Sequence, residues 1–226
     1  MNNYTGVMVF KSGRIELDKK FIISHVRTSD GQVQTNGEHQ FGVARLAGMF
    51  ASEFGMKEWG RIMGLLHDKG KEKRAFQQHI LKESGLDPSI RVEGDYRHAY
   101  VGALIAKKLF PRYHLLMDNA LIGHHRGLYD DGDMKAVMKS QIPDDVDVEE
   151  LKAFFENPRI DKPRDIHHLE RMLYSCLVDA DYLDTEAFMQ PGQSKLRGHH
   201  DSMKILEEKL DAYLEVLRGG CTGYGG

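Results

Sequence analysis

Cysteine is scarce in this chain: 226 residues include two, Cys176 and Cys221. Cys176 lies in an apolar stretch and Cys221 in a glycine-rich tail, so we expect no disulfide framework and a reducing compartment. No apolar run approaches the length of a membrane span, and the N-terminus lacks the basic and apolar segments of a signal peptide. We therefore predict a cytoplasmic protein that does not enter a membrane.

An excess of positive charge is also missing. The chain has 31 basic and 34 acidic residues, and its net charge is -3. Proteins that grip nucleic acid over a broad surface are usually basic. A polyanion would therefore have to meet a local basic patch or bound metal ions. Histidine is abundant by contrast, with 12 copies, and several of them are neighbours.

Helical periodicity dominates the sequence and predicts a mainly α domain over residues 1–218, followed by a flexible tail at 219–226. Short apolar runs around Ser12-Gly13 predict a β-hairpin or irregular N-terminal arm, and Asp30-Gly31 predicts a turn. We expect helices near residues 38–55, 57–67, 72–84, 96–110, 115–125, 148–157, 165–189 and 200–218. In the first helix, one face is expected to carry Phe41, Ala44, Ala47, Phe50 and Ala51.

The stretch GLLHDKGKEKRAFQQHI, Gly64 to Ile80, ends an apolar helix with His67 and Asp68 side by side. Adjacent side chains on a helix point about 100° apart, but at a helix end both can bend toward one point. Gly70 then lets the chain turn away. Taken alone, the pair fits a surface histidine beside a capping aspartate better than a metal site.

Other histidines and aspartates strengthen the metal interpretation. His39 and His98 lie in first turns of predicted helices, and His124-His125 closes another helix. Asp179 and Asp181 lie in LYSCLVDADYL, which is apolar enough to be buried. A buried carboxylate needs a partner, and a cation is the strongest one. Imidazole and carboxylate together suit first-row divalent ions.

The remaining histidines are expected to be bystanders. His167-His168 precedes Asp181 on one predicted helix by ~21 Å at about 1.5 Å per residue, so these residues cannot share a cluster. His199-His200 follows Gly198 and is predicted at the surface. His114 has no assigned role, and His79 is expected to pack or to face a substrate.

The order His39, His67-Asp68, His98, His124-His125, Asp181 resembles the HD superfamily of metal-dependent phosphohydrolases. Three stretches narrow the resemblance to the HD nuclease of type I CRISPR interference, which usually precedes a superfamily 2 helicase: LLHDKGKEKRAFQQHI, SHVRTSDGQVQTNGEHQFGVARLAGMFA and LVDADYLDTEAF. The similarity covers about residues 20–190. Lys69 departs from the pattern, where the family often has an apolar residue. No helicase motif is present, which leaves a stand-alone nuclease subunit or a fragment of a longer protein.

The resemblance implies an all-α HD fold and a nuclease that acts on single-stranded DNA with two divalent ions. It implies one metal site from His39, His67, Asp68 and Asp181, and a second from Asp68, His98, His124 and His125. Asp68 would bridge the ions, with Asp179 facing away. Asp68 and Lys71 are the expected catalytic residues, and Lys71 would neutralise charge developing on the phosphate.

Mixed histidine and carboxylate ligands are expected to favour Mn²⁺, Co²⁺, Ni²⁺ or Fe²⁺ over Mg²⁺. Two such ions carry more charge than two aspartates cancel, which attracts a phosphodiester. Lys69, Lys71, Lys73 and Arg74 are candidates for a local basic patch, although solvated surface is the ordinary interpretation of Lys73 and Arg74. Expected partners are single-stranded DNA, a superfamily 2 helicase domain or subunit, and a CRISPR effector complex.

Three alternatives stay open from the sequence. His25 either supports the site or only packs. The second alternative is an HD phosphohydrolase of nucleotides or cyclic dinucleotides, which needs a closed pocket where a nuclease needs an open groove. The third alternative is a non-catalytic HD module, which loss of a ligand would favour, and no ligand is lost.

Overall fold

The computed structural model describes residues 8–11, 14–17, 21–152, 155, 166–198 and 201–220. The chain divides into two compact units, Met1–Met189 and Gln190–Gly226, and each is described by itself. The first unit holds every predicted site residue. The prediction of one domain over 1–218 stays a prediction, and most of the expected tail, including Cys221, lies outside the described residues.

Two antiparallel hairpins open the chain. β1 (Met8–Lys11) pairs with β2 (Arg14–Leu17), and β3 (Ile23–Arg27) pairs with β4 (Gln32–Thr35). The turn of the second hairpin contains Gly31 at a φ of 73°, a conformation that glycine adopts without steric cost. The expected N-terminal hairpin is confirmed, and the second hairpin accounts for the predicted turn at Asp30-Gly31.

A capping box fixes the start of α1 (Asn36–Ser52). The Thr35 hydroxyl accepts a hydrogen bond from the Glu38 amide at 3.2 Å, and the Thr35 amide donates to Glu38 Oε2 at 2.9 Å. Such reciprocal bonds satisfy amides that a helix otherwise leaves unpaired at its N-terminus. The helix therefore begins two residues before the predicted start, and His39 lies in its first turn.

The buried face of α1 differs from the predicted face at one residue. Phe41 is 54% exposed, so it does not share the buried face with Ala44 and Ala47 as expected. The buried face carries small residues because α2 (Lys57–Leu66) approaches it closely: a Cβ on Gly64 would lie 2.4 Å from the Ala44 Cα, and one on Gly60 would lie 2.4 Å from the Ala47 carbonyl oxygen. A phenylalanine does not fit in such a contact.

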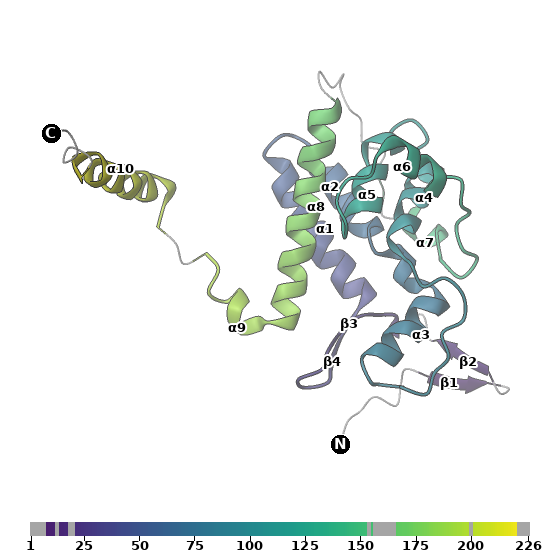
Figure 1. The fold of residues 1–226 in the computed structure, drawn as a ribbon. Coiled ribbons are helices and arrows are strands. Elements are labelled where there is room, and N and C mark those ends of the chain that lie inside the picture. Colours follow the sequence, from purple (N-terminus) through teal and green to yellow (C-terminus); the bar gives the residue numbers. More distant parts are fainter. Residues whose placement is uncertain are drawn as a thin grey trace. The chain divides into compact units, whose positions relative to one another are not determined.

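The rest of the first unit is helical. After α2 come η2 (Lys69–Glu72), α3 (Arg74–Glu83), α4 (Ala99–Leu109), η3 (His114–Leu116), α5 (Asp118–Gly123), α6 (Asp131–Val137), α7 (Glu149–Lys152) and α8 (Ile166–Met189). α8 packs along α1 and α2, and α4 packs on α5 (Figure 1). The core between them contains large, fully buried side chains, among them Trp59, Ile62, Leu66, Ile105, Leu121 and Leu177. The mainly α prediction is confirmed.

Helix boundaries agree best where caps or long periodic runs define them. α8 matches the expected 165–189 closely, whereas the expected 96–110 helix begins only at Ala99 and the expected 115–125 helix divides into η3 and α5. In the second unit, α9 (Pro191–Ser194) precedes α10 (Met203–Gly220), which continues two residues past the predicted end. Within the described ranges, the structure has no helix with the length and apolar content to cross a membrane.

Candidate metal centre

Five histidines and two aspartates from separate parts of the first unit come together around Asp68. Their ligand atoms form two sets, each with all its ligand atoms within 4.8 Å of one another, and Asp68 belongs to both. The first set is His39, His67, Asp68 and Asp181. The second set is Asp68, His98, His124 and His125. The structure thus brings together every residue that the sequence predicted as a metal ligand, while their function as ligands stays a prediction.

Helix ends orient two of the imidazoles. His67 and His124 follow the last residues of α2 and α5. Nδ1 of His67 lies 2.8 Å from the Gly64 carbonyl oxygen, and Nδ1 of His124 lies 2.7 Å from the Leu121 carbonyl oxygen. A carbonyl oxygen only accepts, so each Nδ1 donates its proton and each Nε2 is left as the potential ligand.

The two carboxylate oxygens of Asp68 face different sets. Oδ2 lies 3.3 Å from Nε2 of His39 and 3.3 Å from Nε2 of His67. Oδ1 lies 3.3 Å from Nε2 of His98, 3.5 Å from that of His124 and 4.0 Å from that of His125. This arrangement suits a carboxylate that is shared between two cations.

Buried polar atoms without hydrogen bonds mark the same place. Oδ1 of Asp68 and Nε2 of His124 are buried and lack a hydrogen-bond partner among the described residues, whereas Oδ2 of Asp68 pairs with Lys71. Such atoms are rare in folded proteins, because each one loses its hydrogen bonds to water on folding and gains none in return, which destabilises the folded state. Nitrogen and carboxylate donors are also the ligands that first-row divalent ions accept. The residues present therefore fit divalent cations.

Gly70 is required by close packing rather than by a turn. A Cβ on Gly70 would lie 2.2 Å from the carbonyl oxygen of His98. Its φ is not positive, so the turn that we expected from this glycine is not the reason for it. The absence of a side chain lets the segment after Asp68 rest on the backbone that carries His98, and this contact places the two residues in one set.

Lys71 is buried, with 4% of its surface exposed. Its Nζ lies 2.6 Å from Asp68 Oδ2, donates to Ser24 Oγ at 3.0 Å and lies 3.2 Å from Nε2 of His25. Burial raises the pKa of Asp68, but the positive charge of Lys71 and the neighbouring imidazoles outweigh burial and hold it well below its usual range. A solvent-facing lysine is therefore excluded, and the predicted action of Lys71 on a phosphate stays a prediction.

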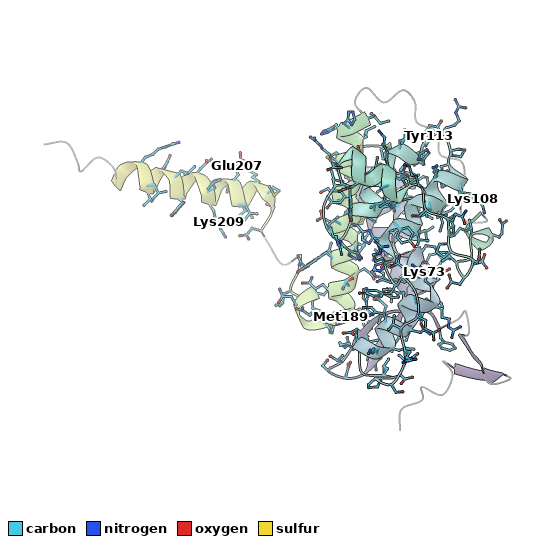
Figure 2. The ribbon with its side chains drawn as sticks, turned by 45° about the vertical axis from the view of Figure 1, so that its right-hand side comes forward. Lys73, Lys108, Tyr113, Met189, Glu207 and Lys209 are labelled. Atoms are coloured by element: carbon cyan, nitrogen blue, oxygen red, sulfur yellow. The ribbon has the colours of Figure 1, made fainter. Side chains whose placement is uncertain are left out.

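The basic patch expected after Asp68 is not present as such. Lys69 is 4% exposed and pairs with Glu72. Lys73, labelled in Figure 2, is 5% exposed and donates to the Arg97 carbonyl oxygen at 2.9 Å and to the Tyr100 hydroxyl at 3.2 Å. The ammonium groups of Lys69 and Lys73 pair with acceptors inside the protein. The interpretation of Lys73 as solvated surface was therefore wrong.

Asp184 is the residue that the sequence reasoning missed. Its Oδ2 accepts a hydrogen bond from Nδ1 of His39 at 2.8 Å, while Nε2 of His39 lies 3.2 Å from Asp181 Oδ1. Asp181 and Asp184 are three residues apart on α8, and this spacing places both on one helix face. That spacing within LVDADYLDTEAF was the available signal.

Gln34 links Asp184 to His25. Its Nε2 donates to Asp184 Oδ2 at 2.8 Å, and its Oε1 lies 2.9 Å from Nδ1 of His25. Nδ1 of His25 therefore donates, and Nε2 is left to accept from Lys71. Burial, followed by the charge of Lys71, lowers the pKa of His25 to about 4, so this imidazole is neutral. The geometry favours the supporting role for His25 over packing alone.

The pKa shifts divide the centre into charged and neutral groups. Burial lowers the pKa of His39, but hydrogen bonds to Asp181, Asp184 and Asp68 raise it to about 10. Burial lowers the pKa of His98, and burial together with the charge of His124 lowers that of His125 to about 3. The neutral imidazoles of His98 and His125 can bind a metal directly, whereas metal binding by His39 must release a proton.

The predicted bystanders lie elsewhere. The His167 side chain is 85% exposed, and His168 is exposed beside it on α8. Asp179 is exposed, in agreement with the expectation that it faces away from Asp181. His114 contacts Asp118, with Nδ1 at 2.6 Å from Oδ2. The remaining pair, His199-His200, lies outside the described residues.

The fold and the paired His/Asp sets are those of a metal-binding helical domain. The sequence matches the HD domain family over residues 36–185, more than half of the chain, and the chain belongs to this family. HD domains bind divalent metals and are usually metal-dependent hydrolases. No curated protein matched the sequence.

Proposed function

We propose that this HD domain is a metal-dependent nuclease that hydrolyses phosphodiester bonds of single-stranded DNA in type I CRISPR interference. One observation carries the proposal: Asp68 turns one carboxylate oxygen toward each of two His/Asp sets. The three sequence stretches that resemble the CRISPR nuclease support the choice of substrate. A superfamily 2 helicase domain or subunit and a CRISPR effector complex are the proposed partners, because single-stranded DNA must be exposed before it is cut.

His39, His67, Asp68 and Asp181 would hold one ion, and Asp68, His98, His124 and His125 the other. Mn²⁺, Co²⁺, Ni²⁺ or Fe²⁺ suits these ligands better than Mg²⁺. When bound, a pair of such ions polarises a phosphoryl oxygen and lowers the pKa of water. The chain's own contribution is to fix the ligands before the substrate arrives.

Three contacts provide that preorganisation. Lys71 holds Asp68 through its Oδ2, Asp184 holds His39 through its Nδ1, and the Gly64 carbonyl holds His67. Imidazoles add no negative charge, so the two aspartates leave a net positive centre when two divalent ions are present. A phosphodiester, which carries one negative charge, is attracted to such a centre. We also propose a cytoplasmic location, which suits Cys176, a buried free cysteine.

A phosphohydrolase of nucleotides or cyclic dinucleotides is the second candidate. The observation that favours it is a cavity of about 260 Å³ beside His98 and His125. A small substrate would have to be enclosed there, whereas a strand would need to pass through. A non-catalytic HD module is disfavoured, because both ligand sets are complete.

The test is a comparison of substrates with the purified chain. The protein is stripped with chelator, reloaded with Mn²⁺, Co²⁺, Ni²⁺, Fe²⁺ or Mg²⁺, and incubated with circular and linear single-stranded DNA, nucleotides and cyclic dinucleotides. We expect DNA cleavage with a transition metal, none in chelator, and none from Asp68→Asn. Full activity in chelator would exclude the metal mechanism. Hydrolysis of small nucleotides alone would establish the second candidate, and bound metal without any hydrolysis would establish the binding module.

A further inference from the structure

A cavity of about 260 Å³ adjoins the second ligand set, with His98 and His125 in its wall. The rest of the wall comes from α3, α4 and the segment before it, α5 and the segment after it, and α6. Neither the ligand sets nor the proposed hydrolysis accounts for these residues. The wall of the cavity therefore needs an explanation separate from metal binding. The cavity lies directly beside the place where a phosphate would bind.

Aromatic rings make up much of this wall. Phe76, Tyr96, Tyr100 and Tyr129 line the cavity together with His79. The His79 and Tyr96 rings are stacked, with centroids 4.1 Å apart and planes inclined by 16°. Tyr96 is nonetheless 45% exposed. His79, for which the sequence left packing and a substrate-facing role open, thus supports one face of a ring at the mouth of the cavity.

Contacts behind the wall hold the rings in place. Nζ of Lys73 donates to the Tyr100 hydroxyl at 3.2 Å and lies 5.2 Å from the centre of that ring. The Asn119 side chain binds both backbone groups of Tyr129, accepting from its amide at 2.7 Å and donating to its carbonyl at 3.1 Å. These contacts explain why a lysine is buried in this part of the molecule: it fixes an aromatic wall.

Two arginines add positive charge at the same place. Arg97 and Arg126 line the cavity and are exposed. Arg97 forms two hydrogen bonds with Asp95, at 2.9 and 3.0 Å, which offset its charge. Arg126 has no ion-pair partner among the described residues. A guanidinium with this freedom can bind a phosphate through two parallel hydrogen bonds.

Size restricts what the cavity can take. Pockets for whole drug-sized ligands measure about 300–1,000 Å³, so this one suits a single ring system that belongs to a larger substrate. Bases of single strands are bound by stacking on aromatic side chains, which tolerates any sequence. We propose that the cavity binds one nucleobase next to the scissile phosphate, stacked on the face of Tyr96 that His79 does not cover, with Arg126 on a neighbouring phosphate.

The inference rests on the proposed nuclease function and specifies how that site holds its substrate. Its first test measures binding without chemistry. In chelator, the full chain is titrated into single-stranded oligonucleotides that carry 2-aminopurine, whose fluorescence falls on stacking, at successive positions. We expect quenching with the wild-type chain and with Tyr96→Phe, and about tenfold weaker binding with Tyr96→Ala. Tyr213→Ala, which removes an exposed tyrosine of α10, is the matched control and should bind as the wild type does.

The second test uses the metal-loaded chain on strands with one abasic position. Cleavage should fall about tenfold when the missing base is the one next to the cut, and Tyr96→Ala should lose this dependence. Cleavage that ignores both the abasic position and Tyr96→Ala would overturn the base pocket and leave the nuclease proposal intact. Quenching that depends on Tyr96 in a chain that cleaves no DNA would instead overturn the nuclease proposal and retain the pocket.

Discussion

Asp184 accepts a hydrogen bond from Nδ1 of His39 at 2.8 Å while Asp181, one turn earlier on α8, lies 3.2 Å from Nε2 of the same ring. A single helix thus supplies both the partner that orients His39 and the carboxylate that would share a metal with it. Partners of this kind fix the tautomer of a ligand histidine and raise its basicity. This relationship leads to the first prediction.

Asp184→Asn should weaken metal binding about 10- to 100-fold, because the amide cannot stabilise the orientation of His39 as a carboxylate does. Metal titration of the apoprotein followed by calorimetry measures the loss. Asp179→Asn, on the exposed side of the same helix, is the control and should bind metal normally. Equal affinities for the two variants would show that Asp184 has no part in holding His39.

Variants of Asp181 and Asp179 test which of the two aspartates is the metal ligand. Asp181→Ala should remove bound metal and most of the DNA cleavage. Asp179→Ala should change neither, and its effect on stability should stay within about 0.5 kcal/mol because Asp179 is exposed. Metal content and denaturation of both purified variants decide the matter. Metal retained in Asp181→Ala but lost in Asp179→Ala would reverse the assignment.

The histidines separate into expected ligands and bystanders. Alanine at His39, His98 or His125 should each remove a ligand and most of the rate. Alanine at His167 or His168 should leave cleavage nearly intact, because both side chains are exposed on α8. Initial rates at saturating metal give the comparison. If both groups of variants lost activity alike, the ligand assignment would be wrong.

Gly70→Ala should damage the second ligand set through the backbone. The added Cβ would lie 2.2 Å from the His98 carbonyl oxygen, which is not free to move as a side-chain tip is. We expect a loss of about 1–3 kcal/mol in unfolding free energy, together with reduced metal occupancy. Gly37→Ala, where the new Cβ meets nothing within 4 Å, serves as the control in the same unit. Unchanged stability of Gly70→Ala would contradict the close packing.

The buried carboxyl group of Asp118 should make the stability of the folded state depend on pH. Burial raises its pKa to about 6 from 3.8, although the contact with His114 opposes the shift. The folded state then binds the proton more tightly than the unfolded state, so stability falls as pH rises from about 4 to about 6. Asp118→Asn should remove this decline, which amounts to roughly 2–3 kcal/mol. Denaturation of both proteins in chelator across this range measures it, and a pH-independent difference between them would refute it.

Local patterns in the sequence predicted the helical fold, and a family resemblance predicted the residues of the candidate centre. Capping residues and long apolar periodicities define helices such as α1 and α8 within the sequence itself, because their hydrogen bonds are local. The resemblance to the HD superfamily, which the order from His39 to Asp181 carries, implied the ligands, and the structure brings these residues together. The assignment of Asp68 as the bridge followed from the family resemblance, and its geometry agrees.

The tertiary structure determines the contacts that hold those residues in place. The Gln34–Asp184 hydrogen bond joins residues 150 positions apart, and the burial of Lys71 and Lys73 depends on acceptors from β3 and α4. Gly60 and Gly64 are required only because α2 lies so close to α1. Periodicity fixes which residues share a helix face, but not which other helix that face meets or how near it comes. Those distances arise only when all elements pack together.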